Sequence, residues 1–167
     1  MDHELFELAE QLGRSLKAGG RKIVTAESCT GGWIAQTITE VPGSSAWFDR
    51  GFVTYSNISK VQMLGVRQET LEKYGAVSAE TAMEMAQGAL SNSDANCACA
   101  VTGIAGPDGG SPEKPVGTVF IAWQYKDGGC EVIKKQFAGA RHQIRRQTVK
   151  TAIEGIADYK LMLAAGG

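Results

Sequence analysis

Three neighbouring residues, Ser28, Cys29 and Thr30, carry two hydroxyls and a thiol at a point where the chain is predicted to pass from strand to helix. Residues 22–26 are apolar and rich in β-branched side chains, which favours a buried strand. Two glycines follow and open a helical spacing of apolar residues. The first amides of a helix lack backbone partners, and glycines let a ligand approach closely. This turn can therefore hold a phosphate or a developing oxyanion, although the hydroxyls can also simply cap the helix.

Two other predicted strands also end on small polar residues, at Tyr55-Ser56 and at Thr102-Gly103. Ligands in open α/β sheets bind outside the carboxyl ends of the strands, so we expect these ends to converge with Ser28. Lys60 lies one helical turn past the first of them. If Lys60 is buried, its pKa falls and it can act as the base for a nearby serine. The alternative is a solvated surface lysine.

A glycine-rich loop at 103–110 follows the third predicted strand. It matches neither the phosphate-binding loop of nucleotide triphosphatases nor the dinucleotide fingerprint, but its backbone amides can contact a phosphate or a ribose. Arg141 opens the last predicted helix, where a guanidinium and free amides together favour a phosphate. The simpler interpretations are a surface loop and, for the arginines that begin this helix, a solvated charged face.

Composition excludes several classes of protein. The chain has 167 residues, 43% of them hydrophobic and 21% charged, which fits one soluble globular domain over 1–167. A net charge of −1 argues against a broad nucleic-acid footprint, and no apolar run is long enough to span a bilayer. The N-terminus does not resemble a signal peptide, and the four cysteines fit reduced thiols, so we expect a cytoplasmic protein. The two histidines lie far from the cysteines, and we expect no metal.

The hydrophobic pattern predicts an α/β fold, a three-layer α/β/α sandwich around a mixed sheet of about five strands. Helices are interleaved with the first three strands, whereas a turn at 126–129 predicts an antiparallel hairpin for the last two. The predicted strands are 22–26, 51–55, 97–101, 117–125 and 130–138, and the predicted helices are 4–18, 31–41, a short one carrying Lys60, 67–74, 78–90 and 141–163.

Several sequence blocks occur together, and their order and spacing over nearly the whole chain resemble the CinA C-terminal domain family, including its stand-alone bacterial nicotinamide-nucleotide amidases. The blocks are Ala26-Glu27-Ser28-Cys29-Thr30-Gly31-Gly32, Pro42-Gly43-Ser44-Ser45, Gly51-Phe52-Val53-Thr54-Tyr55-Ser56-Asn57 with Lys60, Gly75-Ala76-Val77-Ser78, and Gly103-Ile104-Ala105-Gly106-Pro107-Asp108-Gly109-Gly110 with Lys114-Pro115-Val116-Gly117-Thr118-Val119. The pair Ile58-Ser59 departs from the residues common in relatives.

The resemblance implies hydrolysis of nicotinamide mononucleotide to nicotinate mononucleotide and ammonia in pyridine nucleotide recycling, without a metal or other cofactor, by an oligomer of two or more chains. We expect Ser28 to attack the carboxamide, Lys60 to act as its base and Tyr55 to orient or relay the proton. Ser45 is the rival nucleophile. Cys29 is not expected to react. We expect the substrate to be held by Cys29, Thr30, Gly31, Thr102, Gly103, Ala105, Gly106, Thr118 and Arg141.

A second hypothesis, from a different class, is a nucleotide-binding or regulatory module without catalysis. The same glycine loops and Arg141 would serve binding alone, whereas a serine–lysine pair is needed only for chemistry.

Overall fold

The computed structural model describes the backbone of residues 1–166 and the side chains of residues 1–156. Five strands form one mixed sheet in the order β2-β1-β3-β4-β5. The strands are β1 (Ile23–Glu27), β2 (Phe48–Val53), β3 (Cys97–Gly103), β4 (Thr118–Tyr125) and β5 (Cys130–Gln136). The helices are α1 (His3–Ala18), α2 (Trp33–Thr39), α3 (Asn57–Leu64), α4 (Gln68–Tyr74), α5 (Ala79–Ser91) and α6 (Arg141–Gly166), with a 3-10 turn, η1, at Ser44–Ala46.

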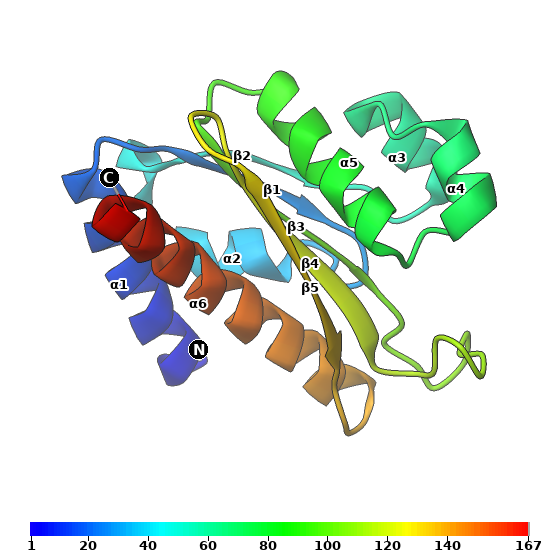
Figure 1. Ribbon diagram of the computed structural model, residues 1–167. Coiled ribbons are helices and arrows are strands. Elements are labelled where there is room, and N and C mark those ends of the chain that lie inside the picture. The colour runs from blue at the N-terminus through cyan, green and yellow to red at the C-terminus, as the bar shows by residue number, and fades with distance from the viewer. Residues whose placement is uncertain (167) are drawn as a thin grey trace.

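The helices cover both faces of the sheet and complete the predicted three layers (Figure 1). Helices α1, α2 and α6 lie on one face, and α3, α4 and α5 lie on the other. Strands β1, β2 and β3 are parallel neighbours, whereas β4 and β5 add in antiparallel fashion, as the hairpin turn predicts. The predicted fold class is therefore confirmed. Among the described residues, no helix is long and apolar enough to cross a membrane.

The two faces of the sheet are packed differently. Side chains of β3 alternate, so that Cys97, Cys99 and Val101 join the core beneath α1, α2 and α6, while Ala98 and Ala100 face α5. Small residues on the second face let α5 lie close to the sheet. The lack of a side chain at Gly88 of α5 likewise lets α3 pack against α5, because a Cβ there would collide with the α3 backbone. Close packing on this face fixes α3, the helix that carries Lys60.

The second strand begins three residues and ends two residues before its predicted bounds. It runs from Phe48 to Val53 rather than over 51–55. It begins early because Trp47 already accepts a hydrogen bond from the Ile23 amide of β1, at 2.9 Å. It ends early because Ser56 caps α3, with its hydroxyl accepting the Ser59 amide at 3.2 Å. Tyr55 therefore lies in the connection between β2 and α3.

Candidate active site

The turn after β1 presents Ser28 at the carboxyl edge of the sheet. The Ser28 amide donates to Val101 of β3 at 3.2 Å, and the Ser28 carbonyl accepts from the Gly31 amide at 3.1 Å. Gly31 and Gly32 adopt φ angles of 60° and 102°, which side chains rarely tolerate. The two glycines thus allow a turn tight enough to join a buried strand directly to a helix.

A buried carboxylate holds this turn from the side of α2. Glu27 is fully buried, and its side chain accepts the Thr30 hydroxyl at 2.6 Å. It also accepts the Ile34 and Ala35 amides at 2.9 and 3.0 Å. These contacts satisfy orphan donors in the first turn of α2 and bring a negative charge to its positive end. Thr30, predicted to hold substrate, uses its hydroxyl to bind Glu27 instead.

Lys60 and Ser28 are brought together from segments 32 residues apart. The Lys60 Nζ lies 3.0 Å from the Ser28 Oγ, 2.8 Å from the Thr54 carbonyl oxygen and 3.3 Å from that of Tyr55. Only 1% of the Lys60 surface is exposed, so the solvated-lysine alternative is wrong. A neutral amine has two N–H donors and one lone pair. If both donors go to the carbonyls, the lone pair faces the Ser28 hydroxyl.

Burial lowers the pKa of Lys60 from 10.5 to about 8, because the protein interior disfavours the ammonium form. At pH 7 about one tenth of Lys60 is then neutral, against roughly one in 3,000 for an ordinary lysine. The nearest charged partner of a buried lysine would normally be a carboxylate, which would raise the pKa again. Here the Nζ contacts only neutral oxygens among the described residues. The environment therefore suits a general base.

Burial has the opposite consequence for the reactivity of the Cys29 thiol, next to Ser28. Cys29 is buried, and burial raises its pKa to about 12. Its thiolate population at neutral pH is correspondingly minute. The Cys29 amide, in contrast, has no backbone acceptor among the described residues. Cys29 is suited to donate a backbone hydrogen bond and unsuited to nucleophilic attack.

A cavity of about 170 Å³ opens onto the Ser28–Lys60 pair. It gathers residues from the carboxyl ends of β1, β2 and β3, as the sheet-edge rule predicts. Eight predicted site residues line it: Ser28, Cys29, Tyr55, Lys60, Thr102, Gly103, Ala105 and Arg141. Three lining residues were missed from the sequence: Asn57, Ala76 and Val77.

Arg141 lies at the rim of this cavity, at the start of α6. Its Nη1 donates to the Gly106 carbonyl at 2.7 Å and its Nη2 to the Tyr55 hydroxyl at 3.2 Å. A guanidinium has five N–H donors, so donors remain for an anion. Gly106 itself contributes a carbonyl to Arg141 and does not line the cavity. Tyr55 also lines the cavity and is 63% exposed.

Three other predicted residues do not line the cavity. Gly31 uses its amide within the turn. The Thr118 hydroxyl is buried and donates to the Pro115 carbonyl at 2.6 Å, so it faces its own loop. Ser45 is exposed on η1, before β2 begins, which places it at the opposite end of the parallel strands from Ser28.

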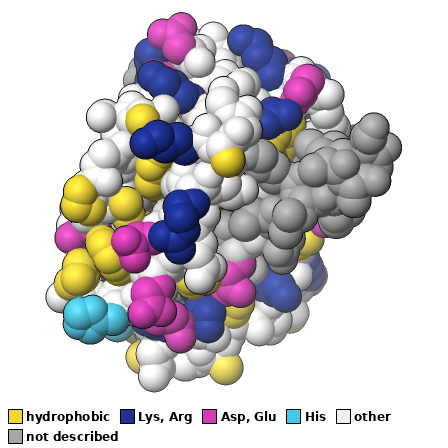
Figure 2. Space-filling view, turned by 90° about the vertical axis from the view of Figure 1, so that its left-hand side faces the viewer, with side chains coloured by type: hydrophobic (Ala, Val, Ile, Leu, Met, Phe, Trp, Pro, Cys, Tyr) yellow, Lys and Arg dark blue, Asp and Glu magenta, His cyan; other side chains and the backbone are white. Residues whose placement is uncertain are grey.

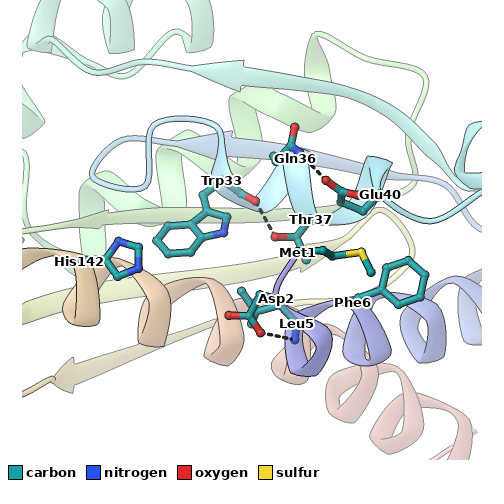
Figure 3. A pocket seen from close by; sticks show the side chains of 9 residues that line it. All are labelled: Met1, Asp2, Leu5, Phe6, Trp33, Gln36, Thr37, Glu40 and His142. Carbon is teal, nitrogen blue, oxygen red and sulfur yellow. Dashed lines mark hydrogen bonds between the residues drawn. The ribbon is translucent and has the colours of Figure 1, made fainter.

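A larger cavity, of about 330 Å³, lies between the first turns of α1 and α6 and the length of α2 (Figure 3). Its lining includes Trp33, His142, Asp2 and Glu40, together with apolar side chains of α1. Asp2 is paired with Arg146 at 2.7 Å, which lowers the pKa of that carboxyl to about 2. Among the described residues, this cavity has no nucleophilic side chain in contact with a base. The smaller cavity is therefore the candidate active site.

Among the described residues, no group of three or more His, Cys, Asp and Glu side chains is arranged to hold a metal ion.

The fold and this site define an α/β protein with a serine–lysine pair at the carboxyl edge of its sheet. A family model described as the CinA C-terminal domain matches residues 5–160, and the chain belongs to that family. It is 54% identical to the "Nicotinamide-nucleotide amidohydrolase PncC" of Escherichia coli K12, over 92% of this chain and 93% of that protein. The protein of the same name from Pseudomonas putida is 52% identical, over 89% of this chain and 92% of the other.

Longer relatives and solved structures also match. A "CinA-like protein" of Endomicrobium trichonymphae is 51% identical over 88% of this chain, but the match spans only 34% of that protein. The crystal structure of a competence/damage inducible protein from Agrobacterium tumefaciens superposes with a TM-score of 0.89, at 51% identity, covering 91% of this chain and 93% of the other. The fold is thus shared with solved members of the family.

Proposed function

We propose that this protein is an amidohydrolase that converts nicotinamide mononucleotide to nicotinate mononucleotide and ammonia, as a step of pyridine nucleotide recycling. The names of the curated relatives, which match over nearly their whole length, support the substrate and the reaction. The observation that carries the chemistry is the contact of 3.0 Å between Ser28 Oγ and the buried Lys60 Nζ. A hydroxyl becomes a useful nucleophile when a neutral base accepts its proton at this distance.

In the first half of the reaction, neutral Lys60 takes the Ser28 proton while Ser28 Oγ attacks the carboxamide carbon. The negative charge that forms on the carboxamide oxygen is stabilised by the Cys29 amide, an effect worth about 3 kcal/mol per donor. The C–N bond then breaks, the Lys60 ammonium returns its proton to the departing nitrogen, and ammonia leaves. An ester between Ser28 and the nicotinate acyl group remains.

In the second half, a water molecule attacks the ester, and Lys60 accepts the proton from that water. The Ser28 oxygen leaves and recovers a proton from Lys60, which restores the starting state. The product is the carboxylic acid, which releases its proton to solvent and becomes a carboxylate. Tyr55 contributes through its backbone carbonyl, which takes one Lys60 donor, and through its hydroxyl, which contacts Arg141.

The phosphate of the mononucleotide is assigned to Arg141 at the cavity rim. Its remaining N–H donors suit a phosphate, and the amides of Ala105 and Gly106 have no acceptor among the described residues. Thr102 lines the cavity, and its hydroxyl donates to the Ala76 carbonyl at 2.8 Å, which leaves its lone pairs for a ribose hydroxyl. The pyridine ring then lies nearest to Ser28 and the phosphate nearest to Arg141.

We also infer a cytoplasmic homo-oligomer that acts on a small molecule and binds neither nucleic acid nor membrane. All four cysteines are free thiols, which supports a reducing compartment. The net charge of −1, and the interspersed positive and negative side chains on the face shown in Figure 2, give no support to a broad nucleic-acid footprint. The oligomer rests on the family resemblance, and light scattering after size-exclusion chromatography measures it directly.

An ammonia-release assay tests the proposal across nicotinamide, its riboside, its mononucleotide and NAD. We expect one ammonia per mononucleotide consumed, and less or none from the other three. Lys60→Met should remove the activity without unfolding the chain, because methionine resembles the apolar methylene chain of lysine in length and character. Saturable binding of the mononucleotide with no ammonia on long incubation would instead support a binding module.

A further inference from the structure

Arg145 approaches the Ser28 turn from behind, without lining the cavity. It lies on α6, one helical turn after Arg141. Its Nε donates to the Cys29 carbonyl and its Nη2 to the Thr30 carbonyl, each at 3.0 Å. One rigid guanidinium therefore binds two successive carbonyls immediately after the candidate nucleophile.

Peptide geometry converts this contact into an orientation of amides. A trans peptide is planar, so its N–H points opposite to its carbonyl. When Arg145 holds the Cys29 carbonyl, the Thr30 amide is directed away from α6. When it holds the Thr30 carbonyl, the Gly31 amide is directed back to the Ser28 carbonyl, where a bond of 3.1 Å is present. The Ser28 carbonyl belongs to the same peptide unit as the Cys29 amide, so Arg145 acts on the position of Ser28 and of this oxyanion donor through the Gly31 amide.

The Arg145 guanidinium is itself held in place. It lies over the Trp33 ring, 5.4 Å from the ring centroid, and the His142 ring lies 5.0 Å from the Trp33 ring. Figure 3 shows the Trp33 and His142 rings side by side between α2 and α6. A guanidinium packed on an aromatic face loses little freedom when it binds two acceptors. The geometry is therefore preformed.

The buried Glu27 and the partly buried Arg145 act on different groups around the turn. Glu27 binds amides and a hydroxyl at the start of α2, whereas Arg145 binds carbonyls of the turn itself. A positive charge on the carbonyl side draws electron density from the peptide units and favours negative charge near their amides. Arg145 acts in this sense on the Cys29 thiol, whose pKa it lowers against the larger effect of burial.

We propose that Arg145 is a positioning residue for the reaction at Ser28: it aligns the turn by its paired carbonyl contacts and adds positive charge behind the oxyanion donors. This inference rests on the proposed amidohydrolase function. Arg145 contacts neither the reacting atoms nor the cavity, so its loss should lower kcat and leave substrate binding almost unchanged.

Arg145→Ala tests this, with Arg146→Ala as the matched control. Arg146 is the next residue on the same helix, is similarly half-buried, and pairs with Asp2 at 2.7 Å and Glu4 at 3.2 Å on α1. We expect Arg145→Ala to lower kcat about a hundredfold with KM changed by less than about threefold, as a displaced catalytic group does. Arg146→Ala should leave kcat within about twofold, because its ion pairs join α6 to α1 and act on stability rather than on the Ser28 turn.

Two further measurements keep the inference falsifiable. Arg145→Lys should fall between wild type and alanine, because an ammonium cannot reproduce the paired guanidinium contact. Hydrogen exchange should accelerate over residues 28–35 in Arg145→Ala, and over α1 in Arg146→Ala. Equal kcat in wild type and Arg145→Ala, or exchange raised throughout the chain, would overturn the positioning role. A wild-type protein that releases no ammonia would refute the proposed function instead, and the exchange pattern would still decide whether Arg145 holds the turn.

Discussion

Two serine-bearing turns of this protein look alike in sequence and differ in structure. Both combine serine with glycine in left-handed backbone: Gly31, with φ 60°, follows Ser28, and Gly43, with φ 83°, precedes Ser44 and Ser45. Ser28 follows a parallel strand, is 8% exposed and contacts a buried lysine. Ser45 precedes the neighbouring parallel strand and is exposed, and no partner of its side chain is found among the described residues.

The difference teaches that the candidate nucleophile is distinguished by its partner, Lys60. Both turns offer a hydroxyl and a tight backbone. Only the carboxyl edge of the sheet receives α3, which follows β2 and returns Lys60 over the end of β1. The five residues of β1 separate the two edges by on the order of 15 Å, far beyond the reach of Lys60.

The largest expected effect on activity comes from replacing Ser28, with the replacement of Ser45 as its comparison. Ser28→Ala should lower kcat about a thousandfold or more, since loss of the nucleophile removes the covalent route. Ser45→Ala should keep activity within a few-fold. Steady-state ammonia release measures both, with circular dichroism as the folding control. A collapse of activity in Ser45→Ala alone would assign the nucleophile to that turn, or would show that it reaches the site of a second copy.

Removing the rim guanidinium should give the next largest effect. Arg141→Ala should raise KM for the mononucleotide about ten- to a hundredfold, because one charge-assisted phosphate contact is worth roughly 1.5–3 kcal/mol. The riboside, which lacks the phosphate, should be affected far less. Equal damage to both substrates would mean that Arg141 supports the site through its contacts with Gly106 and Tyr55 rather than through the phosphate.

The pH profile of kcat/KM should follow deprotonation of Lys60. Its pKa of about 8 means that the active, neutral form increases about fivefold between pH 7 and pH 8 and levels off above. Activity should therefore fall about tenfold per unit below pH 7. A profile that is flat from pH 6 to pH 9 would exclude Lys60 as the base.

The smallest expected effect concerns the thiol next to Ser28. Cys29→Ser should keep activity within about threefold, because the Cys29 thiol stays protonated while its amide, which the substitution leaves in place, makes the proposed contact. Ammonia release and resistance to a thiol-alkylating reagent both report on it. Complete loss of activity in a folded variant would point to thiol chemistry.

Local patterns were enough to predict most of the fold and the core of the site. The apolar run before Ser28, the two glycines after it and the hairpin turn each determine a nearby structure. The rule that strands of an open sheet share a functional edge then brought Ser28, Lys60 and Thr102 together correctly.

What sequence reasoning missed depends on contacts between distant segments. Thr118 has the right hydroxyl, but the path of its loop turns it toward Pro115. Ala76 and Val77 line the cavity through the course of the chain between α4 and α5, for which small apolar residues give no signal. Arg145 resembles its neighbours in the basic run of α6, and only its distance of 3.0 Å to carbonyls more than a hundred residues away distinguishes it.

The burial of Lys60 also sets a limit on the stability of the folded chain. Lowering its pKa from 10.5 to about 8 means that, below pH 8, folding is opposed by about 3 kcal/mol, because the unfolded chain holds the proton more tightly. The penalty declines as pH rises from 8 to 10.5, so this group alone makes the fold more stable in alkali. Relieving it with Lys60→Met should raise the melting temperature at pH 7. The proposed base is thus buried at the expense of thermal resistance, and we expect the most heat-stable form of this fold to be one that lacks Lys60.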